Sequence, residues 1–181
     1  MRVKRIMIVP TLLAVIAGGA AGGSLFAAVN DKKPTANVSN PGPDKADKIV
    51  KIVKTDAEWK KILPPDVYEI TRKAGTEPAF SGKLLNNHQA GVYVCADCGL
   101  PIFSSKTKFH SGTGWPSFWA PINKDRIIER VDNSLPEQRT EVVCARCGAH
   151  LGHVFNDGPP PTHLRFCMNS LALKFIKRKQ K

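Results

Sequence analysis

Two Cys-x-x-Cys pairs constrain this chain more than any other feature of its sequence. The pairs are Cys95/Cys98 and Cys144/Cys147, and each is followed directly by a glycine. Two such pairs on separate segments are typical of a tetrahedral four-cysteine zinc site. The glycine lets the backbone turn so that its N–H groups face the thiolates. Because four protein ligands leave no open position, one structural zinc ion per chain is expected. The alternative is two disulfide bonds, which export would allow.

The fifth cysteine, Cys167, lies outside these pairs, and its neighbours suggest chemistry. A lone cysteine is most often a small buried apolar residue. Here strand alternation predicts that Arg165, Cys167 and Asn169 share one face, while Phe166 and Met168 share the other. A guanidinium beside a thiol can lower the thiol's pKa and make the sulfur nucleophilic. We therefore interpret this face as a reactive site rather than as core.

The N-terminus carries a separate signal. Three basic residues lie within residues 1–5, and residues 6–29 contain no charge. This pattern is typical of a signal peptide or a membrane anchor (residues 1–29), because about 20 apolar residues can cross a bilayer. The positive-inside rule then sends the rest of the chain outward, so we expect an exported, membrane-anchored or periplasmic (extracytoplasmic) protein. Residues 30–54 are rich in Lys, Asp, Asn and Pro and are expected to form a flexible linker.

The chain is basic, with a net charge of +12 over 181 residues. A nucleic-acid-binding patch is one interpretation, and a solvated or membrane-attracted basic tail is the other. The basic residues show little aromatic interleaving, which favours the second interpretation and no nucleic-acid partner. Residues 177–181 are predicted to be a basic tail outside the domain.

The remaining sequence predicts a small, mostly β domain preceded by two short helices. Thr55 and Glu58 form a capping box, which predicts a helix that ends by Leu63. A second helix is expected from the prolines at 64–65 to a stop at Gly75. Short Val, Ile and Phe runs separated by Gly, Pro and Asn then indicate antiparallel strands with long loops. The expected strands are 91–95, 101–103, 127–131, 140–144, 154–155, 163–169 and 170–175.

Two further stretches carry groups that suit a site. In residues 111–119, two glycines and a proline surround two tryptophans, and Trp115 there either lines a pocket or fills the core. His150 and His153 lie three residues apart beside a glycine. They are either structural histidines or proton-handling groups for Cys167, because imidazole titrates near neutral pH.

The segments GTGWPSF, HLGHVF and RFCMN, together with the two Cys-x-x-Cys pairs, resemble the methionine-R-sulfoxide reductases (the B-type enzymes) over about residues 55–176. The resemblance implies an Mss4-like fold, in which two antiparallel sheets form a small sandwich or barrel with short N-terminal helices. It implies a peptide-methionine (R)-S-oxide reductase that repairs oxidised proteins through a Cys167 sulfenic acid. The implied partners are oxidised proteins and an external thioredoxin-like reductant, and a monomer is expected.

The resemblance also implies roles for matching residues. Trp115 is similar to the wall that packs on the sulfoxide's methyl group, and Phe155 to a second substrate contact. The positions implied for catalysis are Cys167 as nucleophile, His150, His153 and Asn169 around the sulfoxide oxygen and an ordered water, and Arg165 with Asp157 as a supporting charged pair.

Two features depart from the family pattern. His110 stands where an aspartate is expected, and this predicts a local effect on loop packing. Many relatives have a resolving cysteine, but no sixth cysteine exists here, so the Cys167 sulfenic acid must be reduced by an external thiol. The competing hypothesis is a four-cysteine zinc-ribbon binding module for a protein or nucleic acid, which leaves Trp115, the two histidines and Cys167 unexplained.

Overall fold

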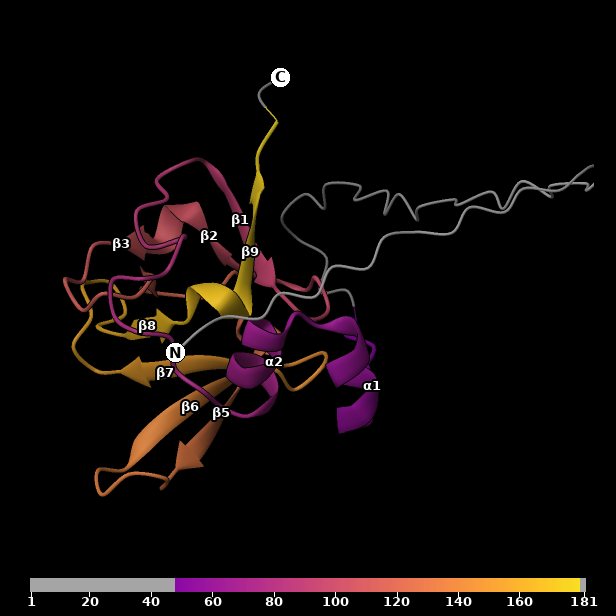
Figure 1. Cartoon of the computed structure of the whole chain (residues 1–181). Helices are drawn as coiled ribbons and strands as arrows, with labels where there is room; N and C mark the ends of the chain where they lie inside the picture. Colours follow the sequence, from indigo (N-terminus) through magenta and orange to yellow (C-terminus); the bar gives the residue numbers. More distant parts are fainter. Residues whose placement is uncertain (1–47, 180–181) are drawn as a thin grey trace, which may run out of the picture. The chain divides into compact units, whose positions relative to one another are not determined.

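The structure is a computed structural model that describes residues 48–179. These residues form two antiparallel β-sheets preceded by two short α-helices (Figure 1), as the sequence predicts. The strands are β1 (Gly91–Cys95), β2 (Pro101–Ser104), β3 (Lys108–Phe109), β4 (Ser117–Phe118), β5 (Ile127–Asp132), β6 (Arg139–Cys144), β7 (His150–Phe155), β8 (Arg165–Met168) and β9 (Leu173–Lys177). The helices are α1 (Asp56–Ile62) and α2 (Pro65–Arg72), and the 3-10 turns are η1 (Ser105–Thr107), η2 (Lys124–Arg126) and η3 (Ser170–Ala172).

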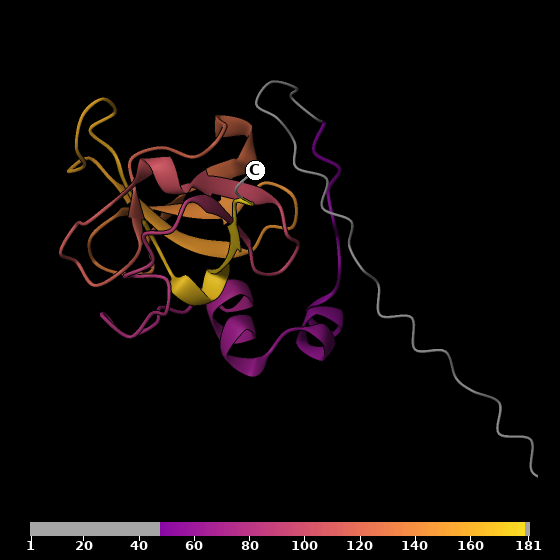
Figure 2. The same ribbon diagram turned by 90° about the horizontal axis from the view of Figure 1, so that it is seen from above.

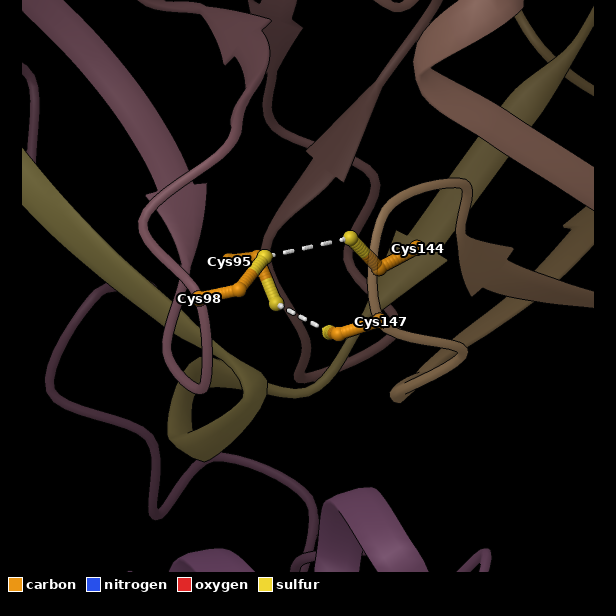
Figure 3. A group of neighbouring side chains, drawn as sticks. All are labelled: Cys95, Cys98, Cys144 and Cys147. Carbon is orange, nitrogen blue, oxygen red and sulfur yellow. Dashed lines mark hydrogen bonds between the residues drawn. The ribbon is translucent and has the colours of Figure 1, made fainter. Parts of the chain in front are cut away.

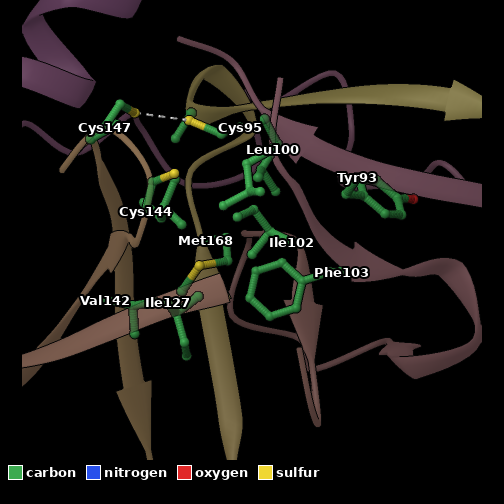
Figure 4. Packing of buried hydrophobic residues seen from close by; sticks show 14 of the residues in the cluster. Tyr93, Cys95, Leu100, Ile102, Phe103, Ile127, Val142, Cys144, Cys147 and Met168 are labelled. Carbon is green, nitrogen blue, oxygen red and sulfur yellow. Dashed lines mark hydrogen bonds between the residues drawn. The ribbon is translucent and has the colours of Figure 1, made fainter. Parts of the chain in front are cut away.

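The two sheets differ in size and share one hydrophobic core. The smaller sheet has the order β2-β1-β9 and the larger one the order β3-β4-β8-β7-β6-β5. Aromatic rings join them: Phe103 of β2 stacks on Phe118 of β4 with 4.4 Å between ring centroids. The edge of Tyr93 meets the same Phe118 ring at 4.9 Å. Figure 4 shows Ile102 and Phe103 near Met168 of β8 in this core. Burial of these large side chains between the sheets supplies the main drive for folding.

The two helices form as their sequence signals predict, with one difference at an end. Thr55 Oγ1 accepts a hydrogen bond from the Glu58 N–H at 3.3 Å, and the Glu58 carboxylate accepts one from the Thr55 N–H at 2.7 Å. This capping box starts α1. Helix α2 ends at Arg72, and Ala74 rather than Gly75 takes the left-handed conformation, with φ 52°. Gly75 is needed for close approach, because a Cβ there would lie 2.8 Å from a backbone carbonyl oxygen of α2.

Several strand boundaries differ from those that the sequence predicts. Strand β7 begins at His150, so the histidine pair belongs to the strand instead of preceding it. Residues 170–172 form η3 before β9 begins. The two-residue strands β3 and β4 have no counterpart in the prediction, because two residues are too few to show a period.

The last residues of the predicted linker are attached to the folded unit. The Ile52 N–H donates to the Arg146 carbonyl at 2.8 Å, and Lys51 Nζ donates to the Ala145 carbonyl at 2.6 Å. Ile52 also packs against the core. Residues 48–54 therefore lie along the turn that follows β6, while residues 30–47 of the predicted linker lie outside the described residues. At the other end, Lys177 of the predicted basic tail still belongs to β9.

The prediction of an exported, membrane-anchored or extracytoplasmic protein needs correction. Within residues 48–179, no helix combines the length and the apolar character that crossing a membrane requires. The segment 6–29, on which that prediction depended, lies outside the described residues.

Candidate active site and metal centre

The four cysteines of the Cys-x-x-Cys pairs meet in one cluster (Figure 3). Their Sγ atoms all lie within 4.8 Å of one another, with 3.7 Å between Cys95 and Cys147 and 3.6 Å between Cys98 and Cys144. A disulfide needs about 2.0 Å, and all five cysteines are free thiols, so the disulfide alternative is not realised. Four sulfur atoms placed tetrahedrally about 2.3 Å from a metal would be separated by about 3.8 Å. The cluster therefore has the dimensions of a single tetrahedral metal site.

Each pair folds into the same tight turn, called a knuckle here. In the first knuckle Gly99 has φ 73° and donates its N–H to the Cys95 carbonyl at 2.9 Å. In the second Gly148 has φ 70° and donates to the Cys144 carbonyl, also at 2.9 Å. Glycine is favoured at such positive φ values because a Cβ would be strained there. Because β1 and β6 belong to different sheets, a metal in this cluster would cross-link the two sheets.

Cys167 lies in β8 on the face opposite the core. Its neighbours Phe166 and Met168 are 2% and 0% exposed and point into the core. Across the sheet, Ser117 of β4 pairs with Cys167 on one side, and His153 of β7 pairs with it on the other. Directly paired residues of adjacent strands present their side chains to the same face. Cys167 is therefore flanked by a hydroxyl and an imidazole.

A chain of hydroxyl groups ends at the Cys167 thiol. Thr113 Oγ1 lies 3.7 Å from Cys167 Sγ, which is hydrogen-bonding distance for sulfur. Ser111 Oγ lies 2.9 Å from Thr113 Oγ1 and 2.7 Å from Ser117 Oγ. Sequence reasoning missed these three hydroxyls, although the residues stand in the segment where it chose Trp115. The hydroxyls can stabilise a thiolate by hydrogen bonding, and they can relay a proton.

Burial raises the pKa of the Cys167 thiol above its ordinary value, and the Thr113 hydroxyl and the Arg165 guanidinium oppose this rise. Arg165 is largely committed elsewhere: Nε and Nη2 each donate to the Asp157 carboxylate at 2.8 Å. The same guanidinium lies 4.3 Å from the centroid of the Phe155 ring. The predicted Arg165–Asp157 pair is therefore present. Arg165 also lowers the pKa of the Cys167 thiol, as expected, but burial raises that pKa by more than Arg165 lowers it.

A bulge in β7 brings the two histidines together. Residues three apart in a regular strand point to opposite faces. The pairing of β6 with β7 shifts between Val142 and Val143, which inserts an extra residue into β7. The imidazole centroids of His150 and His153 are consequently only 5.4 Å apart. Gly152, which follows the extra residue Leu151, allows β7 to lie close to β8, since a Cβ there would overlap the Cys167 carbonyl oxygen.

A carboxylate holds each histidine. His150 Nδ1 lies 2.7 Å from Glu141 Oε1, and His153 Nε2 lies 2.8 Å from Asp132 Oδ2. Burial nevertheless lowers the pKa of His153, so the neutral form is favoured more than in an ordinary histidine. The Nε2 atom of His150 is buried and has no hydrogen-bond partner among residues 48–179. Sequence reasoning missed both carboxylates, which lie in β5 and β6.

Asn169 and Trp115 meet at a residue that sequence reasoning also missed, Glu77. The Glu77 N–H donates to Asn169 Oδ1 at 3.0 Å, and Trp115 Nε1 donates to the Glu77 carbonyl at 3.0 Å. The Glu77 carboxylate, only 3% exposed as a residue, accepts from the backbone N–H groups of Ser170 at 2.6 Å and Leu171 at 3.0 Å. Figures 1 and 2 show the yellow η3 turn beside α2. Helix α2 ends at Arg72, five residues before Glu77. Glu77 thus fixes the segment after Cys167 to the tryptophan loop, and it occupies the side-chain oxygen of Asn169.

These observations define a class of protein. A half-buried thiol stands among hydroxyls and imidazoles, apart from a second group of four thiols that fits a metal ion. Such an arrangement is that of a thiol-dependent oxidoreductase whose fold is tied together by a metal.

Comparison with known proteins specifies the family. The SelR domain model matches residues 63–177. The peptide methionine sulfoxide reductase MsrB of Herminiimonas arsenicoxydans is 51% identical over 125 residues, which cover 69% of this chain and 91% of the relative. The MsrB proteins of Methanosarcina mazei and Leptospira interrogans are each 54% identical; the matches cover 70% and 68% of this chain and 91% and 95% of the relatives. The chain belongs to the SelR-domain family of peptide methionine sulfoxide reductases. This membership does not favour the alternative of a zinc-ribbon binding module.

Proposed function

We propose that this protein reduces the R epimer of methionine sulfoxide in oxidised proteins to methionine, using electrons from thiols. The family membership supports the reaction, and one observation in the fold assigns the nucleophile to a single residue. Cys167 is the only cysteine outside the four-thiol cluster, and its Sγ lies among polar groups that suit an attack on a sulfoxide.

In the first step, Cys167 attacks the sulfoxide sulfur as a thiolate and the sulfoxide oxygen is protonated. The proton leaves the thiol through the hydroxyl chain that begins at Thr113, or through His153 on the adjacent strand. Methionine is released and Cys167 retains the oxygen as a sulfenic acid. Sulfur of the substrate is reduced by two electrons, and the cysteine sulfur is oxidised by two.

Binding of the substrate is assigned to two aromatic side chains, Trp115 and Phe155. Trp115 supplies a wall for the methyl group of the sulfoxide, and its indole is held in place by the hydrogen bond to the Glu77 carbonyl. Phe155, whose ring lies against the Arg165 guanidinium, is proposed as a second contact with the substrate. His150 and His153, each fixed by a carboxylate, are proposed to orient the oxygen. Asn169 is proposed to act indirectly, because its side-chain oxygen already accepts from Glu77.

Cys167 must then return to the thiol. A thiol reductant, which we infer to be a thioredoxin-like protein, attacks the sulfenic acid, releases water and forms a mixed disulfide at Cys167. A second thiol of the reductant breaks this disulfide. The four remaining cysteines belong to the four-thiol cluster, so no cysteine of the chain itself is assigned to this step.

We infer that the clustered cysteines hold one zinc ion per chain. Zinc there would supply a structural cross-link between the sheets and take no part in the redox step. The catalytic domain is proposed to span residues 55–176 and to act as a monomer, and the family match to residues 63–177 supports the larger part of this span.

The test is methionine release from a dabsylated methionine sulfoxide with dithiothreitol as reductant. The wild-type protein should act on the R epimer and leave the S epimer. The matched control is Cys167→Ser, which should keep metal and fold but lose turnover, because a serine hydroxyl near pH 7 is a poor nucleophile. Turnover by that variant, or equal use of both epimers, would contradict the proposal.

A further inference from the structure

The chemistry proposed above leaves one hollow beside the site without a role. It is a pocket of about 160 Å³ between the loop that carries Trp115, strand β3 and the segment 80–88. Within this loop Thr113 contacts the Cys167 thiol, while Ser111, Gly112, Gly114 and Trp115 line the pocket. Adjacent Cα atoms are only about 3.8 Å apart. The pocket therefore begins within one residue of the group that touches the nucleophile.

An exposed aromatic side chain stands at the edge of this pocket. Phe80 is 70% exposed, although large apolar side chains usually avoid water. Its backbone adopts φ 66°, a conformation rarely taken by a bulky residue. The Phe80 N–H donates to the Gly114 carbonyl at 2.8 Å, which fixes the backbone of Phe80 to the same loop. Gly114 itself leaves room for this contact, because a Cβ there would lie 2.8 Å from Ala79 Cβ. Backbone strain that displays an apolar ring in solvent points to a binding role.

The pocket is also basic. Lys108, His88 and His110 line it, and no Asp or Glu stands among its lining residues, all of which belong to the described part of the chain. The Lys108 ammonium donates to the Leu85 carbonyl at 2.6 Å, which holds it in place. An acidic group entering this pocket would find a fixed cation and no opposing carboxylate.

A peptide substrate has the reach to enter. An extended chain advances about 3.3 Å per residue, so a residue one to three positions from the reacting methionine sulfoxide spans the loop. The wall formed by Trp115 is common to the substrate site and the pocket. The pocket is thus continuous with the surface on which the sulfoxide would bind.

We propose that this pocket is a subsite for the residues that flank methionine sulfoxide in a polypeptide substrate. The Phe80 ring is the apolar platform for the flanking chain, and Lys108 favours an acidic flanking side chain over a basic one. This inference rests on the proposed function and adds to it a sequence preference among oxidised proteins.

The first test compares three substrates: N-acetyl-methionine-R-sulfoxide N-methylamide, which carries no charge, and two peptides in which the same sulfoxide is flanked by Glu or by Lys. Phe80→Asn removes the ring while keeping a residue that tolerates positive φ. It should raise KM for both peptides, lowering kcat/KM about five- to tenfold, and change the small substrate less than about twofold. Phe80→Tyr should restore the peptide rates. The control is Ile62→Asn on α1, another exposed apolar residue at 58% exposure, which should affect no substrate.

The second test isolates the charge. Lys108→Gln should reduce the preference for the Glu peptide over the Lys peptide to about onefold and leave the small substrate unchanged. An unchanged preference, or a Phe80→Asn effect that is equal on all three substrates, overturns the subsite. If the wild-type protein fails to reduce even the small substrate, the proposed function itself is wrong, and the subsite falls with it.

Discussion

Thr113 Oγ1 and Cys167 Sγ lie 3.7 Å apart, although the two residues are separated by 54 positions in the sequence. The contact joins the glycine-rich loop to the middle of β8. The neighbour of the nucleophile at this position is a hydroxyl group, and a cysteine at position 113 would place a second thiol there. This relationship determines how the oxidised enzyme can be reduced.

We predict that Thr113→Cys creates an internal route for that reduction. With substrate and no reductant, the wild-type protein should release one methionine per chain and leave Cys167 reactive with dimedone. In the variant, the new thiol should attack the sulfenic acid and form a disulfide with Cys167, so that dimedone labelling disappears. Mass spectrometry of the peptides distinguishes the two products. The control is Ser111→Cys, which adds a thiol to the same loop farther along the hydroxyl chain. Persistent dimedone labelling in Thr113→Cys would show that the geometry does not permit the bond.

Loss of the metal should unfold the protein. Cys144→Ser removes one ligand, and structural zinc contributes on the order of 10 kcal/mol of apparent binding free energy in small domains. We expect this variant to lose zinc and its cooperative thermal transition, as measured by metal analysis and circular dichroism. Cys167→Ser, the matched control, should keep both. A Cys144→Ser protein with the wild-type melting temperature would refute the structural role.

The resting nucleophile should be mostly a protonated thiol at neutral pH. Because burial raises the pKa of Cys167, the rate of alkylation by iodoacetamide should increase with pH, with a midpoint above the ordinary thiol value of about 8.5. Arg165 opposes the effect of burial, so Arg165→Met should move the midpoint still higher. Mass spectrometry of zinc-loaded protein measures the labelling at Cys167. A midpoint near pH 7 would mean that the thiol is activated before substrate binds.

Trp115 should contribute to substrate affinity more than to folding. Trp115→Ala removes an apolar wall worth about 2 kcal/mol, so KM should rise by about 30-fold with a modest change in melting temperature. Trp115→Phe keeps a ring but loses the hydrogen bond to Glu77. The KM of this variant should lie between the KM of the wild type and that of Trp115→Ala. If Trp115→Ala simply unfolds the protein, the residue is core rather than substrate wall.

His153 should act on the chemical step. His153→Ala is expected to lower kcat by about 10²-fold or more with little change in KM, if the imidazole handles a proton. Asp132→Asn keeps the imidazole but weakens the contact of 2.8 Å that orients it, so a smaller loss and a shifted pH–rate profile are expected. The control is Asp125→Asn, an exposed carboxylate in the η2 turn. An unchanged pH profile in Asp132→Asn would reduce that residue to a structural role.

Local spacing made part of this molecule predictable. The two Cys-x-x-Cys pairs determined the thiol cluster, because two turns of the same kind present thiols in the same way wherever strands bring them together. Alternation around Cys167 determined which of its neighbours enter the core, and the capping box of Thr55 and Glu58 determined where α1 begins. The two-sheet class followed from short strands and turn residues. Each of these properties depends on residues within a few positions of one another.

The environment of the nucleophile was decided only by the tertiary structure. Thr113, Asp132, Glu141 and Glu77 carry no local signal of these roles, because the site contacts that give them a role join residues distant in the sequence. Those contacts are with Cys167, His153, His150 and Ser170, at separations of 54, 21, 9 and 93 positions. The bulge in β7, whose extra residue Leu151 precedes Gly152, is also invisible in the spacing of the two histidines, which predicts opposite faces. Strand order and register determine which polar groups become neighbours, and burial between those neighbours determines the pKa of the thiol. The sequence by itself determined which thiol is free to react, and the packing of distant segments decided what surrounds it.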